Sequence, residues 1–286
     1  MNKHLSRGWP APAKLNLFLH ITGRRADGYH LLQTVFQFLD LCDSLDFELR
    51  EDGRILRAQG PAEVPEREDL TVRAAELLKE HTGGAAGVAI NLRKVIPTEA
   101  GLGGGSSDAA TTLVALNDLW GTGLKAEELA ALGLKLGADV PVFLGGRAAW
   151  AEGLGELLTP LELPEPWYLV IQPACRVATR EIFQAPELTR NSAPITIAGF
   201  RAGLGHNDFE PTVRARYPEV SKALDWLAAH GPARLTGSGA CVFAAFADEG
   251  AARKAGAGLP QGWRGFVTQG CNRSPLLDRL AEERSR

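Results

Sequence analysis

The stretch from Pro97 to Ser107 constrains this chain more than any other, because it reads Pro-Thr-Glu-Ala-Gly-Leu-Gly-Gly-Gly-Ser-Ser. Alternating apolar residues at 88–92 precede it and predict a strand, and apolar residues at helical spacing over 109–120 follow it. A glycine-rich turn between a strand and a helix lets backbone N–H groups converge on an anion at the positive end of that helix. The stretch therefore predicts a phosphate cradle, and the alternative is a flexible surface loop.

Two better-known phosphate-binding patterns do not match this loop. No lysine follows the glycines, as the P-loop requires. Ser106 stands where the dinucleotide-binding fingerprint requires a glycine. Ser106 and Ser107 instead offer hydroxyl groups that can cap the helix, contact phosphate or approach a metal ion. Any phosphate binding here must follow a different pattern.

The order of the predicted elements favours an α+β fold over a doubly wound parallel sheet. Several strands precede the glycine-rich loop and long helices follow it, whereas a doubly wound fold would alternate the two. Strands are expected over 13–21, 31–39 and 44–50, and helices over 69–81 and 125–136. The proline-rich stretch 160–166 is expected to be the passage to a second half of the chain.

Composition excludes several classes of protein. The 31 basic and 34 acidic residues give a net charge of -3, so no bulk cationic field attracts nucleic acid or an anionic membrane. We find no run of 18 apolar residues and no secretory signal at the start. The cysteines lack metal-ligand spacing and are expected to be free thiols in a reducing, cytoplasmic compartment; they are Cys42, Cys175, Cys241 and Cys271.

Lys14 and Asn16 lie two residues apart in the first predicted strand. Their side chains should project from the same face, about 7 Å apart, while the apolar residues at 15, 17, 19 and 21 share the opposite face. Asn is depleted in strands, so its presence beside a lysine fits a site for a polar ligand. A solvated outer face is the alternative.

Three more segments carry two interpretations each. The turn over 22–30 displays two arginines, Tyr29 and His30, which suits an anionic or aromatic ligand or an ordinary hairpin loop. Asp139 stands two residues before Pro141, the pattern of a helix N-cap, although a capping carboxylate can also be a catalytic one. The glycines at 237–239 form either a simple tight turn or a second backbone wall beside the phosphates.

Taken together, these segments resemble the GHMP kinases, the superfamily of galactokinase, homoserine kinase and mevalonate kinase. The resemblance spans Pro12 to Pro275 and rests on several motifs in the family's order. Within the superfamily, the resemblance is most specific to the kinases that act on cytidine-diphosphate-linked methylerythritol. The motifs that carry it are Pro12–Leu19, Arg25–His30, Gly137–Phe143, Asn207–Pro211 and Thr236–Cys241.

The resemblance implies a two-lobed α+β kinase with its active site in the cleft between the lobes. It implies an ATP-binding lobe over residues 1–159 and a second lobe over 160–286. ATP with Mg²⁺ would phosphorylate the 2-hydroxyl of the methylerythritol unit, giving the 2-phosphate and ADP, in the non-mevalonate route to isoprenoid precursors. We expect a monomer or a weak homodimer that binds neither nucleic acid nor membrane.

The resemblance also implies residue roles. Asp139 would be the general base, Lys14 would lie beside it and stabilise charge on the reacting groups, and Asn16 would hold the erythritol. The expected cytidine site is Tyr29, His30, Thr179 and Phe183. ATP would contact Lys94, near the adenine, together with Pro97, Ala100, Gly101, Leu102, Gly103, Gly104, Gly105, Ser106 and Ser107.

One part of the loop departs from the family pattern, because Thr98–Ala100 places Glu99 at the edge of the expected phosphate site. Glu99 either helps to hold Mg²⁺ or faces solvent, and no direct metal ligand is predicted. Two other functions stay open. A GHMP kinase for another small alcohol would have no use for the Tyr29–His30 loop, and a catalytically inactive ligand sensor would not need both Lys14 and Asp139.

Overall fold

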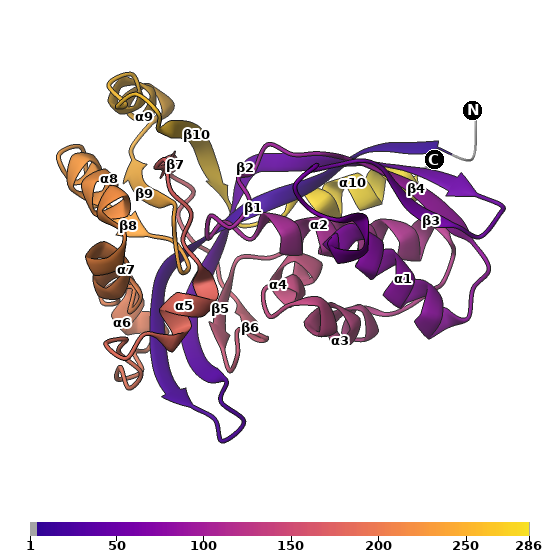
Figure 1. The fold of residues 1–286 in the computed structure, drawn as a ribbon, viewed down its shortest axis with the longest axis horizontal. Helices are drawn as coiled ribbons and strands as arrows, with labels where there is room; N and C mark the ends of the chain where they lie inside the picture. Colours follow the sequence, from indigo (N-terminus) through magenta and orange to yellow (C-terminus); the bar gives the residue numbers. More distant parts are fainter. Residues whose placement is uncertain (1–4, 286) are drawn as a thin grey trace.

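The computed structural model describes residues 5–285 and has the predicted α+β fold (Figure 1). Its described strands form one continuous sheet: β1 (Leu5–Arg24), β2 (His30–Arg50), β3 (Ile55–Gln59), β4 (Gly87–Arg93), β5 (Ala149–Glu152), β6 (Leu157–Pro160), β7 (Trp167–Gln172), β8 (Arg234–Leu235), β9 (Val242–Phe246) and β10 (Arg264–Cys271). The helices are η1 (Glu66–Glu68), α1 (Leu70–Thr82), α2 (Gly104–Leu119), α3 (Ala126–Leu136), α4 (Val140–Gly145), α5 (Thr179–Gln184), α6 (Ile197–Arg201), α7 (Glu210–Arg216), α8 (Pro218–Ala228), α9 (Glu249–Gly256) and α10 (Pro275–Arg284).

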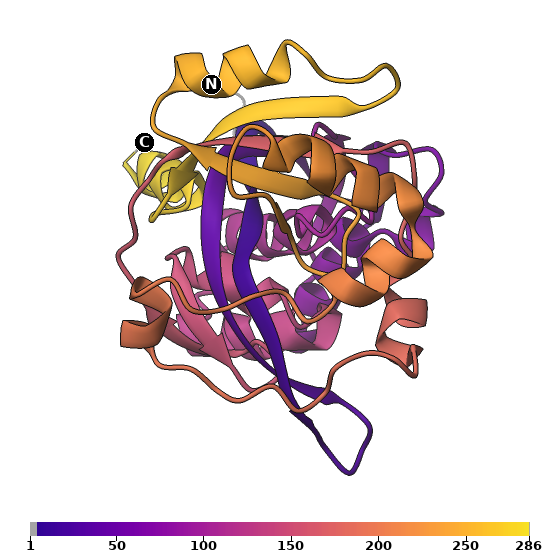
Figure 2. The same ribbon diagram turned by 90° about the vertical axis from the view of Figure 1, so that its left-hand side faces the viewer.

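The antiparallel pair β1 and β2 runs through both halves of the molecule (Figures 1 and 2). The prediction of separate strands at 31–39 and 44–50 is wrong, because β2 continues between them. Two acidic residues between the predicted strands have hydrogen-bond partners in neighbouring segments. Asp40 accepts hydrogen bonds from Thr268 Oγ1 and the Gln269 amide, and Asp43 accepts from the amides of Val95 and Ile96.

In the first half, helices α1 and α2 pack against one face of the sheet formed by β1 to β4, and α3 and α4 pack on these helices (Figure 1). Helix α2 is the central helix, and twelve of its residues are buried. The C-terminal helix α10 returns to this half and packs on β1 and α2. Its Arg279 guanidinium lies 4.6 Å from the centre of the Trp9 ring.

The second half is built on the strand order β10-β7-β9-β8, with α8 and α9 packed against it (Figure 2). Strand β10 joins the halves, since it pairs with β7 over residues 264–269 and then with β2 at Gly270 and Cys271. The sheet is therefore continuous across the boundary where the cleft lies.

Register shifts in β1 flank the residues that the sequence singled out. The pairing with β2 slips between Pro12 and Lys14 and again between Asn16 and Leu19. Such bulges re-aim side chains and are common beside active sites. The prediction that one apolar face continues from 15 to 21 is wrong, because Leu19 lines the same cavity as Lys14 and Asn16.

The predicted helices at 69–81 and 125–136 are confirmed as α1 and α3. Asp69 caps α1 through a hydrogen bond from the Thr71 amide. The turn between β1 and β2 forms a hairpin that projects from the body of the molecule in both views (Figures 1 and 2). All four cysteines are free thiols. None of the helices described within 5–285 has the length and apolar character to cross a membrane.

Candidate active site

A cavity of about 330 Å³ lies where elements of both halves meet. Its walls come from the middle of β1 and β2, the glycine-rich loop, the start of α4, helix α5 and the turn at 237–238. It brings together several of the predicted site residues, which lie far apart in the sequence. These are Lys14, Asn16, Gly101, Gly103, Ser106, Asp139, Thr179 and Phe183, and Glu99 lies at the same cavity.

The Lys14 ammonium is the charged centre of this cavity. The side chain is 3% exposed, and Nζ lies 2.6 Å from Asn16 Oδ1 and 3.1 Å from the Gly101 carbonyl oxygen. Its ion-pair partner is Asp139, with Oδ2 at 3.3 Å. A buried ammonium held by one carboxylate and two neutral acceptors favours further negative charge nearby. The alternative of a solvated outer face for Lys14 and Asn16 is wrong.

Asp139 occupies the N-cap position of α4, but its side chain accepts no capping hydrogen bond. The capping interpretation is therefore wrong for the carboxylate, although Pro141 does lie in the first turn. The carboxylate instead lines the cavity beside Lys14 and is 37% exposed. A carboxylate that reaches the cavity without a capping hydrogen bond can accept a proton from a bound hydroxyl group.

The glycine-rich loop leads directly into α2, as predicted, with Gly103 at the N-cap in the left-handed conformation. No side chain caps this end of the helix, so its first N–H groups remain for a ligand. A Cβ on Gly103 would lie within 3.0 Å of Phe143 and would press on the Lys14 stem. Glycine here lets the loop approach Lys14.

The other loop residues contribute in different ways. Pro97, Ala100 and Leu102 are buried in the core, so only their backbone can face a ligand. Gly104, Gly105, Ser106 and Ser107 form the first turn of α2, and the Ser106 and Ser107 side chains do not cap it. The buried Ser107 Oγ has no hydrogen-bond partner among the described residues.

The turn at 236–239 packs backbone to backbone against the glycine-rich loop. Thr236 Oγ1 lies 3.2 Å from the Gly101 carbonyl oxygen and 3.1 Å from the Asn16 amide nitrogen. The Cys241 amide donates to the Ala100 carbonyl at 3.0 Å. The segment is thus a tight turn that also forms a wall of the cavity, with Gly237 and Ser238 in its lining.

Lys94 is held by two buried aspartate side chains just before the loop. Its Nζ forms an ion pair with Asp43 and lies 2.7 Å from Oδ2 of Asp108 on α2. Burial raises the pKa of the Asp108 carboxyl to about 8, because Lys94 only partly offsets the loss of solvent and Asp43 adds repulsion. A hollow of about 300 Å³ adjoins Lys94, lined by Gln59, Gly60, Pro61, Leu92 and Arg93.

Of the predicted cytidine-site residues, Thr179 and Phe183 line the cavity, whereas Tyr29 and His30 are not among its lining residues. Thr179 and Phe183 are one turn apart on α5, and Thr179 Oγ1 lies 2.7 Å from Ser238 Oγ. The rings of His30 and Phe183 pack with their centres 5.1 Å apart. Tyr29 stands next to His30 on the hairpin and is 63% exposed, so its ring is free to cover a ligand.

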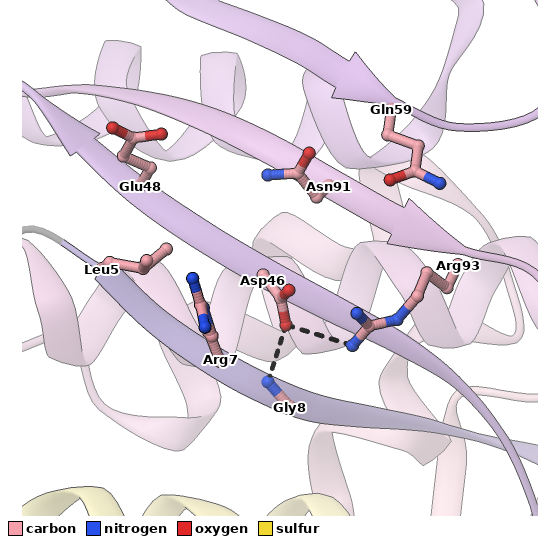
Figure 3. A pocket seen from close by; sticks show the side chains of 8 residues that line it. All are labelled: Leu5, Arg7, Gly8, Asp46, Glu48, Gln59, Asn91 and Arg93. Atoms are coloured by element: carbon pink, nitrogen blue, oxygen red, sulfur yellow. Dashed lines mark hydrogen bonds and ion pairs between the residues drawn. The ribbon is translucent and has the colours of Figure 1, made fainter.

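A separate hollow of about 520 Å³ lies on the outer face of the sheet (Figure 3). Its lining residues alternate along β1 to β4 with the core residues of the helix-covered face. Asp46 accepts from the Gly8 amide at 2.8 Å and pairs with Arg93 at 3.3 Å. Asp46 and Arg93 thus pair with each other on this sheet face, and none of the predicted site residues lines the hollow.

Sequence reasoning did not assign several residues that shape the cavity. Thr236 was seen only as part of a glycine turn, although its hydroxyl joins β1 to the loop. The Asn207 amide donates at 2.9 Å to the carbonyls of Leu235 and Gly237. Asn207 lies in one of the quoted motifs, so the motif was a usable signal, whereas no sequence signal pointed to Asp43, the partner of Lys94.

Comparison with known proteins agrees with this geometry. The family model "GHMP kinases N terminal domain" matches residues 69–147, and "GHMP kinases C terminal" matches 193–265. A curated 4-diphosphocytidyl-2-C-methyl-D-erythritol kinase from Nitrosococcus oceani is 61% identical over 95% of this chain and 97% of its own length. One from Alkalilimnicola ehrlichii is 60% identical over 97% of this chain and 96% of its own.

Solved structures give the same assignment. A crystal structure of 4-(cytidine 5'-diphospho)-2C-methyl-D-erythritol kinase superposes with a TM-score of 0.78 at 37% identity, over 91% of this chain and 98% of that one. The mevalonate kinase of Methanococcus jannaschii shares the fold, with a TM-score of 0.69 at 16% identity over 94% and 99% of the two chains. The chain therefore belongs to the GHMP kinases, in the family of the 4-diphosphocytidyl-2-C-methyl-D-erythritol kinases.

Proposed function

We propose that this chain uses ATP to phosphorylate the 2-hydroxyl of 4-(cytidine 5'-diphospho)-2-C-methyl-D-erythritol, giving the 2-phosphate and ADP. The reaction belongs to non-mevalonate isoprenoid precursor biosynthesis. The observation that carries the proposal is the pairing of Lys14 with Asp139 at 3.3 Å in a cavity that also holds the N-terminal loop of α2. Full-length relatives with the same named activity support the choice of substrate.

In this reaction the substrate hydroxyl oxygen attacks the γ-phosphorus of ATP. The bond from that phosphorus to the bridging oxygen breaks, ADP leaves, and the hydroxyl proton passes to the Asp139 carboxylate. Lys14 offsets the negative charge that gathers on the phosphoryl oxygens, and Asn16 holds the erythritol beside it. Phosphoryl transfer depends mainly on such positioning and charge neutralisation.

The glycine-rich loop, from Gly101 to Ser107, binds the ATP phosphates through the free N–H groups at the start of α2. Two observations support this assignment. Glycine is required at Gly103 for the loop to reach Lys14, and the buried Ser107 Oγ lacks a partner among the described residues. Adenine occupies the hollow beside Lys94, where Gln59 to Pro61 face Leu92 and Arg93.

The donor set of the cavity suits a magnesium ion that travels with ATP. The described residues hold no group of three or more His, Cys, Asp or Glu side chains placed to bind a metal ion. Mg²⁺ commonly binds through one or two carboxylates together with substrate phosphates and water. Glu99 and the Ser106 hydroxyl are protein oxygens in the cavity that fit this role, and the ion would neutralise phosphate charge.

We also propose that the chain divides into two lobes, over residues 1–159 and 160–286. We propose further that the protein is cytoplasmic and acts as a monomer or weak homodimer.

The substrate's cytidine lies between Tyr29 and Phe183, beside His30 and Thr179. The contact between the tilted rings of His30 and Phe183 supports this site, because it joins the hairpin to α5. Because Phe183 lines the same cavity as Lys14, one ligand can span from the base pocket to the reacting centre.

The substrate assignment is tested by ADP release from Mg-ATP with one alcohol at a time: the cytidylyl substrate, methylerythritol phosphate, mevalonate or homoserine. Turnover with the cytidylyl substrate alone is the expected result. Turnover with another alcohol would overturn the base pocket and leave the kinase assignment intact. Binding of ATP without turnover of any alcohol would favour a ligand sensor.

A further inference from the structure

The guanidinium group of Arg190 joins His30 to the segment that follows α5. Its Nε lies 3.2 Å from His30 Nε2. Nη1 donates to the carbonyl of Leu188 at 2.9 Å, and Nη2 donates to those of Phe183 at 3.1 Å and Ala185 at 2.7 Å. One half-buried side chain thereby fixes both the ring of His30 and the backbone at Phe183.

This contact determines where the proton of His30 lies. A guanidinium group has five N–H donors and no acceptor, so Nε2 of His30 can only accept. The single N–H of a neutral imidazole must then be on Nδ1. Protonation at Nε2 would break the bond and place two positive charges side by side. Accordingly, burial, and after it the charges of Arg190 and Arg24, lower the pKa of His30 below its ordinary 6.5.

We infer that Arg190 is a positioning residue for substrate specificity, which holds His30 as a ring whose Nδ1–H is offered to the base of the substrate. The inference rests on the proposed function, because that function assigns His30 to the cytidine site. Among the described residues His30 Nδ1 has no hydrogen-bond partner, which leaves it for a ligand. Arg190 itself need not touch the substrate.

The tautomer matters because the pyrimidines differ at one ring nitrogen. N3 of cytosine is an acceptor, whereas N3 of uracil carries a hydrogen. A fixed Nδ1–H donor that meets N3 therefore accepts cytosine and opposes uracil, since two donors would face each other. If Arg190 did not fix the ring, His30 could shift its proton to Nε2 and present an acceptor instead.

The ring proton is measured directly by long-range ¹H–¹⁵N correlation spectra of the full-length protein with ¹⁵N-labelled histidine. The chain has six histidines, and the signal missing from the His30→Gln variant identifies His30. We expect the Nδ1–H form in the wild type. In Arg190→Met the proton should move in part to Nε2. An Nε2–H form in the wild type would overturn the inference without any kinetic measurement.

Kinetics separate this role from a purely structural one. Arg190→Met should raise KM for the cytidylyl substrate about tenfold, the effect of one poorly presented hydrogen bond. It should leave KM for ATP and kcat within about twofold and weaken the preference over the uridylyl analogue. Arg190→Lys, which keeps the positive charge but has a single donor nitrogen, should fall between Arg190→Met and the wild type. The matched control is Arg216→Met, which breaks only the exposed pair with Glu187 and should behave as wild type.

An equal rise of both KM values, or the same change in Arg216→Met, would overturn the inference and indicate a folding effect. Wild-type kinetics in a folded Arg190→Met would overturn it and leave the proposed function standing. A wild type that fails to turn over the cytidylyl substrate would instead overturn the proposed function. Titration with cytidine 5'-diphosphate should shift the ring signals of His30, and unchanged signals would remove His30 from the base site.

Discussion

The carbonyl oxygen of Thr236 packs so closely on Gly101 that a Cβ added to Gly101 would lie less than 3.0 Å from it. This relationship joins the phosphate loop of the first half to the glycine turn of the second, without a spacer between the two backbones. The Gly237 position is similarly tight, with a Cβ there 3.2 Å from the Cα of Gly101. The cavity between the halves depends on two backbones that only glycine allows so close together.

Gly101→Ala should therefore weaken ATP binding and destabilise the protein. The new Cβ meets the Thr236 backbone, and the φ of +80° is itself unfavourable for alanine. We expect a loss of about 3 kcal/mol or more in the free energy of unfolding and a higher KM for ATP. Urea unfolding and ADP-release kinetics measure both.

Gly123→Ala is the matched control, because its φ of +70° is similar and nothing lies within 4 Å of the new Cβ. The free energy of unfolding of this variant should fall by only about 1–2 kcal/mol, the effect of the backbone conformation alone. Its KM for ATP should be unchanged. Equal losses in the two variants would show that the contact with Thr236 has no consequence of its own.

Tyr29→Ala should weaken binding of the cytidylyl substrate and leave ATP binding nearly intact. The ring is 63% exposed on a projecting hairpin, so its removal disturbs little of the core, while a stacked base loses about 1–3 kcal/mol of contact. Isothermal titration with cytidine 5'-diphosphate and with ATP separates the two sites. An equal loss of affinity for both ligands would indicate that Tyr29 contributes to folding and not to binding of the base.

Asp108→Asn should change how stability depends on pH. The pKa of the Asp108 carboxyl is raised to about 8 in the folded chain, from about 3.9 when unfolded. Between these values the folded state binds the extra proton, so this group lowers stability as pH rises from about 4 to 8. Asparagine cannot titrate, and the variant should gain stability over the wild type with increasing pH.

Chemical unfolding of both proteins at pH 5 and pH 8 tests this. The free energy of unfolding of Asp108→Asn, relative to that of the wild type, should be higher at pH 8 than at pH 5. The increase should be at most about 1.4 kcal/mol per pH unit. Asp46→Asn serves as a control on the solvated face of the sheet. A difference that is the same at both pH values would mean that Asp108 does not titrate in this range.

The local parts of the site were predictable from the sequence. The loop over 97–107 has a short-range signature, since glycines, a preceding strand and a following helix are all read from neighbouring residues. Lys14 and Asn16 were placed on one face by the two-residue period of a strand, and the structure confirms that they meet. These predictions needed no information about distant contacts.

The remaining features depend on contacts that no local pattern records. The bulges on either side of Lys14 and Asn16 come from pairing with β2, so the sequence of β1 alone did not predict that Leu19 would join their face. The continuity of β2 depends on partners for Asp43 at the end of β4. Arg190 reaches His30, 160 positions earlier in the sequence, from an irregular segment, where periodicity gives no signal.

The most direct test of the account is the turnover number of Asp139→Asn with Mg-ATP and the cytidylyl substrate. Asparagine keeps the size of the side chain beside Lys14 but cannot accept the hydroxyl proton. We expect kcat to fall by about 10² to 10⁴, the usual effect of losing a general base, with the KM for ATP little changed. A variant that turns over at the wild-type rate would contradict the central claim, because the carboxylate at 3.3 Å from Lys14 would then have no part in the chemistry.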